Sequence, residues 1–332
     1  MLRFGLVGTG RIGTMHARNL AANPRVELAY VYDIDEPAAR KAAEGAGARL
    51  APDIATILSD TAVDAVLIAS PTNTHVDLIA QAAKAGKAVL CEKPIDLDIT
   101  RANQCRDQIA DCGVPIQIGF NRRFDPSHGA LREAVQAGEI GRIEKLIITS
   151  RDPAPPPADY VRVSGGLFRD MMIHDFDLAR FIMADEPVAV SAMGSALVDP
   201  DIASGGDIDT AMVLMKTASG TLCHINCSRR AVYGYDQRIE AFGPGGMLIS
   251  DNHTRTTVER YGKQATAAHE PLLNFFIERY ADAYVNQVNA FVDAVEQGRP
   301  AAPSFEDGRR ALILANAGGE SLQTGRSVKV VY

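Results

Sequence analysis

The first 33 residues constrain the fold of this chain more than any other stretch, because their elements follow one another in a demanding order. An apolar run over residues 4–8 is typical of a buried strand, residues 11–20 have helical spacing, and a second apolar run covers residues 26–32. Three glycines in the pattern G-x-G-x-x-G join the first strand to the helix: Gly8, Gly10 and Gly13. A chance glycine turn would not bring these flanking elements with it, so the order predicts a strand–helix–strand unit that binds a dinucleotide.

Each glycine has its own physical task in such a unit. Gly8 permits a tight turn, Gly10 lets the backbone approach a pyrophosphate, and Gly13 allows the helix to pack close to the strand. The N–H groups at the start of the helix then face the phosphates. The neighbours of the glycines complete the predicted phosphate loop: Thr9, Arg11 and Ile12.

An acidic residue ends the second apolar run and indicates which dinucleotide is bound. Asp33 lies about 20 residues after Gly13, where a carboxylate accepts hydrogen bonds from the adenosine ribose. A 2′-phosphate there would meet like charge, and Asp35 adds to that charge. Arg40 lies too far along the next helix to offset it. The predicted cofactor is therefore NAD rather than NADP.

Length and charge limit the kind of partner. At 332 residues the chain is long for a single core, which suggests two domains. With 34 basic and 41 acidic residues the net charge is −7, which argues against nucleic acid or an anionic membrane and favours a small molecule. No apolar run approaches the roughly 18 residues of a membrane span, and no secretory leader is recognisable, so we expect a cytoplasmic protein.

The cysteines predict neither a disulfide framework nor a metal centre. Their number, five, is odd, in a large chain without a recognisable leader. Cys223 and Cys227 stand four apart in an alternating segment, so they project from one face of a strand while His224 projects from the other. We expect buried thiols and no bound zinc.

Residues 1–121 alternate strands with helices, which predicts an α/β Rossmann domain with a parallel sheet. The further strands are expected at 63–70, 88–91 and 115–120, and the further helices at 74–85, with Thr74 as N-cap, and at 99–112. The carboxyl ends of parallel strands meet at one edge of the sheet, where ligands bind. The residues predicted to contact the cofactor at that edge are Ser70, Pro71, Asn73, His75, Glu92 and Lys93.

The alternation of strands and helices ends after residue 121, where a series of successive strands begins. Residues 122–332 predict an α+β domain that binds the substrate and forms oligomers. Its strands are expected at 143–149, 188–196, 211–217, 222–228, 239–242 and 247–250, and its helices at 167–183, 272–297 and 305–323. The pattern indicates a large, mostly antiparallel open sheet with helices on one face. Such a sheet suits an oligomer interface, and the last helix is a candidate to pack back on the first domain.

Three polar segments are candidates for catalysis. Lys93 follows a strand at the ligand edge and can hydrogen-bond a substrate oxygen, although most lysines lie on the surface. Asp170 and His174 have i, i+4 spacing, so on a helix the carboxylate can orient the imidazole as a general base. A surface ion pair has the same spacing, and Asp177 is also near His174 in sequence. Arg122, directly after the last predicted strand of the first domain, is the third candidate.

Four segments together resemble the Gfo/Idh/MocA oxidoreductase family: AVLCEKP, GFNRRFD, GGLFRDMMIHDFDLARF and CSRRAVYGYDQRIEAFGPGGML. The resemblance spans nearly the whole chain and implies NAD(P), a two-domain subunit, and a dimer or tetramer built through the open sheets. It puts the family's lysine on Lys93 and its acid–histidine pair on Asp170 and His174. It also implies that Tyr233 and Tyr235 belong to a segment that reaches the polyol.

Within the family the chain looks most like the inositol-oxidising members, which implies a homotetramer that oxidises a ring hydroxyl of myo-inositol in inositol catabolism. The residues expected to bind the polyol are Lys93, Arg122, Asp152, Asp170, His174 and Tyr235. Asp152 is a departure, because relatives carry asparagine there. An ionised carboxylate accepts but cannot donate a hydrogen bond, which leaves the hydroxyl pattern of the substrate open.

The mechanism implied by this resemblance assigns one step to each catalytic residue. His174 removes the hydroxyl proton while hydride leaves the same carbon for NAD, Asp170 orients the imidazole, and Lys93 stabilises the developing alkoxide. Three alternatives stay open: oxidation of scyllo-inositol or a pyranose, a hydrolase or epimerase that retains its NAD, and a dinucleotide sensor without catalysis. Contacts in the substrate pocket decide the first alternative. Cofactor that stays bound through purification would indicate the second, and NADH binding without turnover of a polyol would indicate the third.

Overall fold

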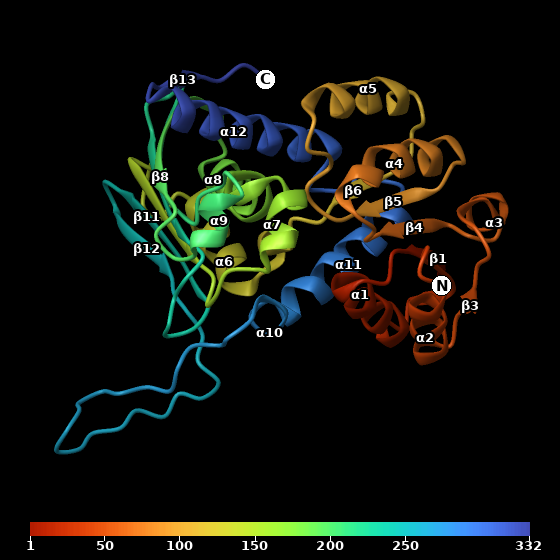
Figure 1. Ribbon diagram of the computed structural model, residues 1–332, viewed down its shortest axis with the longest axis horizontal. Coiled ribbons are helices and arrows are strands. Elements are labelled where there is room, and N and C mark those ends of the chain that lie inside the picture. Colours follow the sequence, from red (N-terminus) through yellow and green to blue (C-terminus); the bar gives the residue numbers. More distant parts are fainter. The chain divides into compact units, whose positions relative to one another are not determined.

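The computed structural model describes residues 1–332, apart from the side chain of residue 158, and the chain divides into two compact units whose elements Figure 1 labels. Unit 1 comprises Met1–Asn121 and Tyr284–Leu312, and unit 2 comprises Arg122–Ala283 and Ile313–Tyr332. The segment Tyr284–Leu312, which the sequence analysis placed in the second domain, thus groups with the first. Its apolar side chains complete the core there: the ring of Phe291 meets that of Phe4 edge-on at 5.9 Å.

Unit 1 is built on a six-stranded parallel sheet in the order β3-β2-β1-β4-β5-β6. Its strands are β1 (Leu2–Val7), β2 (Val26–Tyr32), β3 (Arg49–Leu50), β4 (Ala65–Ile68), β5 (Ala88–Cys91) and β6 (Ile116–Ile118). The strand order reverses between β1 and β4, which is the position where an open parallel sheet leaves a crevice for a ligand. The predicted Rossmann domain is confirmed.

The helices of unit 1 connect these strands. They are α1 (Arg11–Ala22), α2 (Glu36–Ala46), α3 (Ile54–Ser59), η1 (Thr72–Thr74), α4 (His75–Lys84), α5 (Ile99–Ile109), α11 (Ala281–Glu296) from Tyr284 onward, and α12 (Phe305–Thr324) up to Leu312. Thr74 occupies the N-cap position of α4, as predicted, but its side chain makes no capping hydrogen bond. The Thr74 hydroxyl instead donates to the carbonyl of Pro71 at 2.7 Å, within the 3-10 turn η1.

Unit 2 contains a seven-stranded mixed sheet in the order β12-β11-β7-β10-β9-β8-β13. The strands are β7 (Lys145–Arg151), β8 (Pro187–Ser195), β9 (Thr210–Thr217), β10 (Leu222–Ser228), β11 (Asp236–Gly243), β12 (Gly246–Ser250) and β13 (Val328–Lys329). β7 and β10 are parallel and the other neighbouring pairs are antiparallel. The sheet is therefore mostly antiparallel, as predicted. Along β10, Cys223 and Cys227 alternate with polar residues and are both buried, as predicted.

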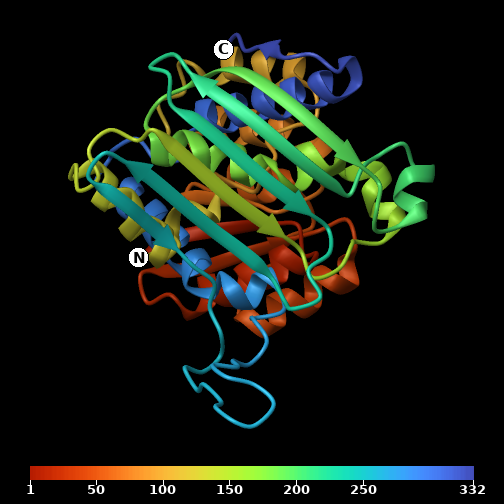
Figure 2. The same cartoon turned by 90° about the vertical axis from the view of Figure 1, so that its left-hand side faces the viewer.

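Helices cover one face of this sheet and leave the other open, which Figure 2 shows face-on. The helices whose side chains pack against the covered face are α6 (Pro126–Gln136), η3 (Leu167–Met171), α8 (Ile173–Met183) and the rest of α12. Unit 2 further contains η2 (Asn121–Phe124) from Arg122 onward, α7 (Ala158–Ser164), α9 (Pro200–Ser204) and α10 (Phe276–Arg279). The open face carries exposed apolar side chains: Met193, Met212, Leu214, Leu222, Met247 and Ile249.

Two helices predicted for the second domain begin later in the structure than expected. The range 167–183 begins as a π-turn, η3, in which the Met172 N–H donates to the Leu167 carbonyl, before α8 starts. The range 272–297 becomes helical only at α10, because Leu272 and Leu273 use their backbone groups to pair with the loop of Tyr233 and Tyr235. Both departures come from tertiary contacts that local periodicity does not contain.

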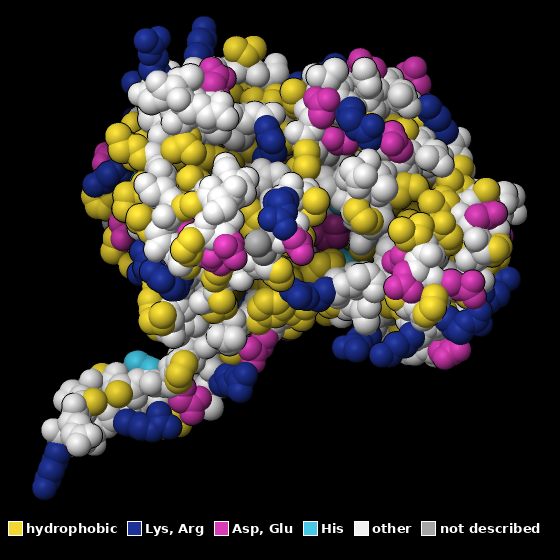
Figure 3. All heavy atoms as spheres, viewed as in Figure 1, with side chains coloured by type: hydrophobic (Ala, Val, Ile, Leu, Met, Phe, Trp, Pro, Cys, Tyr) yellow, Lys and Arg dark blue, Asp and Glu magenta, His cyan; other side chains and the backbone are white. Residues whose placement is uncertain are grey.

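The surface has the character expected from the composition. Basic and acidic side chains are interspersed over the face drawn in Figure 3. Among the described residues, no helix combines the length and apolar character that a membrane crossing requires. Of the free cysteines four are buried, and Cys112 is half-buried rather than buried as predicted.

Candidate active site

The glycine loop of unit 1 has the geometry that its sequence predicts. Gly8 has a φ of +97°, and a Cβ there would lie 2.4 Å from the Ser70 nitrogen. A Cβ on Gly13 would lie 2.0 Å from the Gly8 carbonyl oxygen. A Cβ on Gly10 would meet nothing within 4 Å among the described residues. Two glycines thus serve protein packing, whereas Gly10 keeps space open at the start of α1, where a phosphate group fits.

Asp33 is tied to this loop. Its Oδ2 accepts from the Thr9 N–H at 2.6 Å and from the Thr9 hydroxyl at 2.9 Å, while Oδ1 accepts from the Asp35 N–H at 3.0 Å. Burial alone would raise the pKa of Asp33, but the hydrogen bonds donated by Asp35 and Thr9 outweigh it and lower the pKa. The carboxylate is therefore ionised at neutral pH, as the prediction of NAD requires.

His75 fixes the two loops that follow β4 and β5. Its Nδ1 lies 2.7 Å from the Pro94 carbonyl oxygen and its Nε2 lies 2.8 Å from the Ser70 carbonyl oxygen. The ring is buried, and burial outweighs these contacts in lowering its pKa. Because both nitrogens face backbone carbonyls, His75 links the Ser70 and Pro94 loops and presents neither nitrogen to a ligand.

A second buried histidine, which the sequence analysis missed, braces the same edge. His16 of α1 places Nε2 2.8 Å from Glu92 Oε1, and its ring meets Tyr284 edge-on at 5.7 Å. Glu92 directly precedes Lys93, which is half-buried. The pair joins the phosphate-facing helix to the Glu-Lys-Pro loop. No local pattern marks His16, because its partner is 76 residues away.

In unit 2 the centre of the polar cluster is Arg122, whose side chain is buried. Its Nη1 donates to Asp175 Oδ1 at 2.6 Å and to the Ser150 hydroxyl at 3.3 Å, and its Nη2 donates to the Tyr235 hydroxyl at 3.3 Å. Burial raises the pKa of Asp175 to about 6, although Arg122 and Ser150 oppose the rise. Arg122 and Tyr235, both predicted, thus contact each other directly, and Asp175 and Ser150, which were not predicted, hold the guanidinium group in place.

Asp152 follows β7 beside this cluster. Burial raises its pKa to about 6, with Arg229 and Arg122 opposing the rise and Asp170 and Asp175 adding to it. Three carboxylates and two guanidinium groups thus influence one another in this part of unit 2. Such a cluster of buried charges is typical of a functional site rather than of a packed core.

The two tyrosines of the Tyr-Gly-Tyr segment differ in placement. Tyr235 is buried in the Arg122 cluster. Tyr233 is 44% exposed; its hydroxyl donates to Asp236 Oδ2 at 2.7 Å and accepts from Arg151 Nη1 at 2.7 Å. Tyr235, and not Tyr233, therefore belongs to the Arg122 cluster.

Asp170 lies in η3 and His174 is the second residue of α8, so the predicted pair spans the junction of a π-turn with an α-helix. Asp170 Oδ1 accepts from the Tyr160 hydroxyl at 2.9 Å, and Oδ2 lies 3.3 Å from Arg229 Nη2. π-turns of this kind recur at functional sites. Tyr160 and Arg229 are further residues that the sequence analysis missed.

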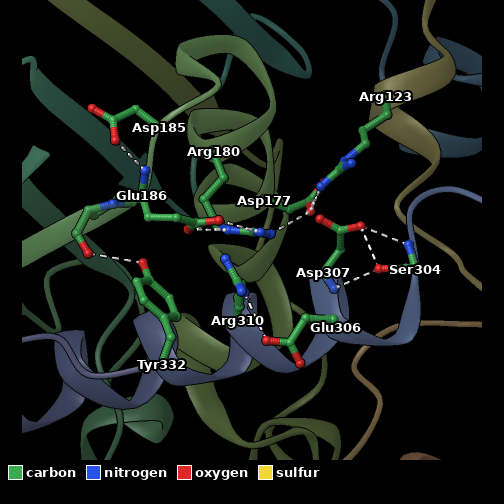
Figure 4. A network of polar contacts seen from close by, with 11 residues as sticks. Arg123, Asp177, Arg180, Asp185, Glu186, Ser304, Glu306, Asp307, Arg310 and Tyr332 are labelled. Atoms are coloured by element: carbon green, nitrogen blue, oxygen red, sulfur yellow. Dashed lines mark hydrogen bonds and ion pairs between the residues drawn. The ribbon is translucent and has the colours of Figure 1, made fainter. Parts of the chain in front are cut away.

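Asp177, the alternative partner of His174, belongs to another network, drawn in Figure 4. Its carboxylate accepts from Arg123 Nε at 2.7 Å and from Arg123 Nη2 at 2.6 Å. Arg180 Nη1 lies 3.8 Å from Asp177 Oδ1. Arg180 in turn donates to both oxygens of Glu186. This leaves Asp170 as the better candidate for orienting His174.

Unit 1 thus carries a dinucleotide loop and unit 2 carries a cluster of largely buried charges, and comparison with known proteins gives the class of protein that has both. Residues 2–120 match the model of an oxidoreductase family with an NAD-binding Rossmann fold, and residues 128–249 match the GFO/IDH/MocA C-terminal domain. The chain belongs to the Gfo/Idh/MocA family, and its cofactor is NAD.

Three similar proteins are informative. A myo-inositol 2-dehydrogenase of Thermotoga maritima is 47% identical over 99% of this chain and 98% of its own. The crystal structure of a myo-inositol dehydrogenase from Corynebacterium glutamicum is 45% identical, with a TM-score of 0.97 over 100% of this chain and 99% of its own. A scyllo-inositol dehydrogenase from Lactobacillus casei, crystallised with NAD(H) and scyllo-inositol, is 30% identical, with a TM-score of 0.92 over 99% of each chain.

Proposed function

We propose that this chain is an NAD-dependent inositol 2-dehydrogenase that oxidises one ring hydroxyl of myo-inositol to the keto-inositol. The observation that carries the proposal is the cluster of buried Arg122 and Tyr235 with half-buried Asp152, which offers both donors and acceptors to the hydroxyl groups of a polyol. The full-length similarity to myo-inositol dehydrogenases supports it, since the scyllo-inositol relative is less similar.

In this proposal the residues of the chain move a proton and stabilise charge. His174 takes the hydroxyl proton at an imidazole nitrogen, Asp170 orients the ring and supports its protonated form, and Lys93 stabilises the developing alkoxide. Bound NAD supplies the acceptor for the hydride. Asp152, when ionised, accepts a hydrogen bond from a further hydroxyl.

The geometry of unit 1 supports the proposed cofactor contacts. The open space at Gly10 and the ionised Asp33 fit a pyrophosphate and an adenosine ribose. The residues proposed to contact NAD are Gly8, Thr9, Gly10, Arg11, Ile12, Gly13, Asp33, Ser70, Pro71, Asn73, Glu92 and Lys93. His75, predicted as a contact, is proposed instead to hold the Ser70 and Pro94 loops in place.

The open face of the unit 2 sheet supports a homotetramer. Its exposed apolar residues include Met212 and Leu214 on β9, and Met247 and Ile249 on β12, which three intervening strands separate from β9 across the same face. Isolated exposed apolar side chains are ordinary, but several on one sheet face indicate a protein interface. We propose that copies of the chain associate through this face in the cytoplasm.

Initial rates of NADH formation by the purified protein test the proposal, with NAD and myo-inositol, scyllo-inositol or D-glucose. The highest kcat/KM is expected with myo-inositol. Preference for another ring would keep the mechanism and replace the substrate. NAD retained through purification without net NADH formation would indicate a hydrolase or epimerase, and NADH binding without turnover of any polyol would indicate a sensor.

A further inference from the structure

Arg229 is one of the largest fully buried side chains of the protein, with 1% of its surface exposed. It directly follows β10, and its backbone N–H donates to the Asp209 carbonyl at 2.8 Å, which fixes where the side chain starts. A buried guanidinium group is costly unless carboxylates pair with it. Its place in unit 2 therefore needs an explanation that the packing of an apolar core does not give.

The charges around Arg229 come from the proposed site. Its Nη2 lies 3.3 Å from Asp170 Oδ2, and the other oxygen of Asp170 accepts from Tyr160. Among the charges that lower the pKa of Asp152, that of Arg229 is the largest. Its Nε is buried without a hydrogen-bond partner in the part of the chain that the structure describes. The guanidinium group therefore serves two carboxylates of the site and retains an unused donor.

We propose that Arg229 is a positioning residue for the dehydrogenase reaction: it holds Asp170 in the orientation that supports His174. This inference rests on the function proposed above. Tyr160, on α7, shares this task through its hydrogen bond to Asp170.

The expected pH effect follows from the charged groups that face this site. They are Arg229 after β10, Arg122 of η2, Asp152 after β7, Asp170 of η3 and Asp175 of α8, with the thiol of Cys227 and the hydroxyls of Tyr160 and Tyr235 as weaker acids. Without Arg229, three carboxylates would face one guanidinium group. The stronger negative field would favour protonated His174, which cannot act as a base.

Three variants separate positioning from packing: Arg229→Met removes the charge at similar length, Arg229→Lys keeps it, and Arg230→Met alters the exposed neighbouring arginine. NADH binding and thermal unfolding verify that each variant is folded. For Arg229→Met we expect kcat to fall about tenfold or more and the acid limb of the kcat profile to move about one pH unit higher. Arg229→Lys should keep the wild-type limb, and Arg230→Met should match the wild type throughout.

A folded Arg229→Met protein with an unshifted acid limb would show that Arg229 is only structural and would overturn the inference. If that variant does not fold, the lysine variant decides: an acid limb that moves despite the retained charge would overturn it. Tyr160→Phe tests the shared task, since an unchanged kcat would show that Tyr160 takes no part in positioning Asp170. Wild-type protein that binds NADH but oxidises no polyol would instead refute the proposed function.

Discussion

The candidate sites of the two units differ in the groups that form them, which are mainly backbone groups in unit 1 and side chains in unit 2. In unit 1 the site consists of backbone: Gly8, Gly10 and Gly13 shape a loop within six consecutive positions, and Asp33 is held by donors of that loop. In unit 2 the site consists of side chains from separate elements, among them Arg122 and Arg229, whose partners are tens of residues away. Unit 1 should therefore be sensitive to added volume, and unit 2 to altered charge.

The largest effect is expected from His174→Ala in unit 2. Removing a general base lowers the rate by about a hundredfold to ten-thousandfold, so kcat should fall within that range while NADH binding to unit 1 is retained. Steady-state kinetics with myo-inositol and NADH titration measure the two quantities. The matched control is His224→Ala on β10, which should leave both close to wild type; near-normal turnover by His174→Ala would refute the assignment of the base.

A smaller effect, of opposite character, is expected from Gly10→Ala in unit 1. The added methyl group meets no described atom within 4 Å, so the protein should fold normally, but the methyl occupies the space proposed for a phosphate. Overpacking of about 1–3 kcal/mol corresponds to a loss of roughly tenfold to a hundredfold in NAD affinity. Isothermal titration calorimetry with NAD measures it.

Gly45→Ala, in α2, is the control for that change, because its added methyl group is equally unobstructed but lies far along the chain from the glycine loop. It should leave NAD affinity unchanged. Equal affinity in the Gly10 and Gly45 variants would show that no part of the dinucleotide approaches Gly10, and the comparison between a backbone site and a side-chain site would fail.

The contrast between the units also explains what the sequence could predict. The glycine loop, Asp33 and strands such as β2 and β10 follow from short patterns, because local sterics and alternation determine them. The pairing of Arg229 with Asp170, and of His16 with Glu92, depends on which elements the fold brings together. Family resemblance pointed to Asp170 and Tyr235, but neither resemblance nor pattern pointed to Arg229 or Tyr160.

The smallest effect is expected from Asp152→Asn, which should stabilise the folded protein but weaken its binding of the polyol. Burial raises the pKa of Asp152 from 3.8 to about 6, so ionising it costs stability. That cost is absent below pH 3.8, where the folded and unfolded chains both hold the proton, grows between pH 3.8 and about 6, and is complete above about 6. At most about 3 kcal/mol is involved, and less in practice because the residue is partly accessible to solvent.

Asparagine cannot ionise, so Asp152→Asn should raise the unfolding temperature at pH 8, and the gain should shrink at pH 5. KM for the polyol should rise at pH 8 in the same protein, because an acceptor for a hydroxyl is weakened. Asp175→Asn offers the contrast: its pKa is also raised to about 6, but it pairs with buried Arg122 at 2.6 Å, so its loss should destabilise the fold. Stabilisation by both changes, or a gain for Asp152→Asn that is equal at both pH values, would mean that these carboxylates act through packing and that charge does not distinguish unit 2 from unit 1.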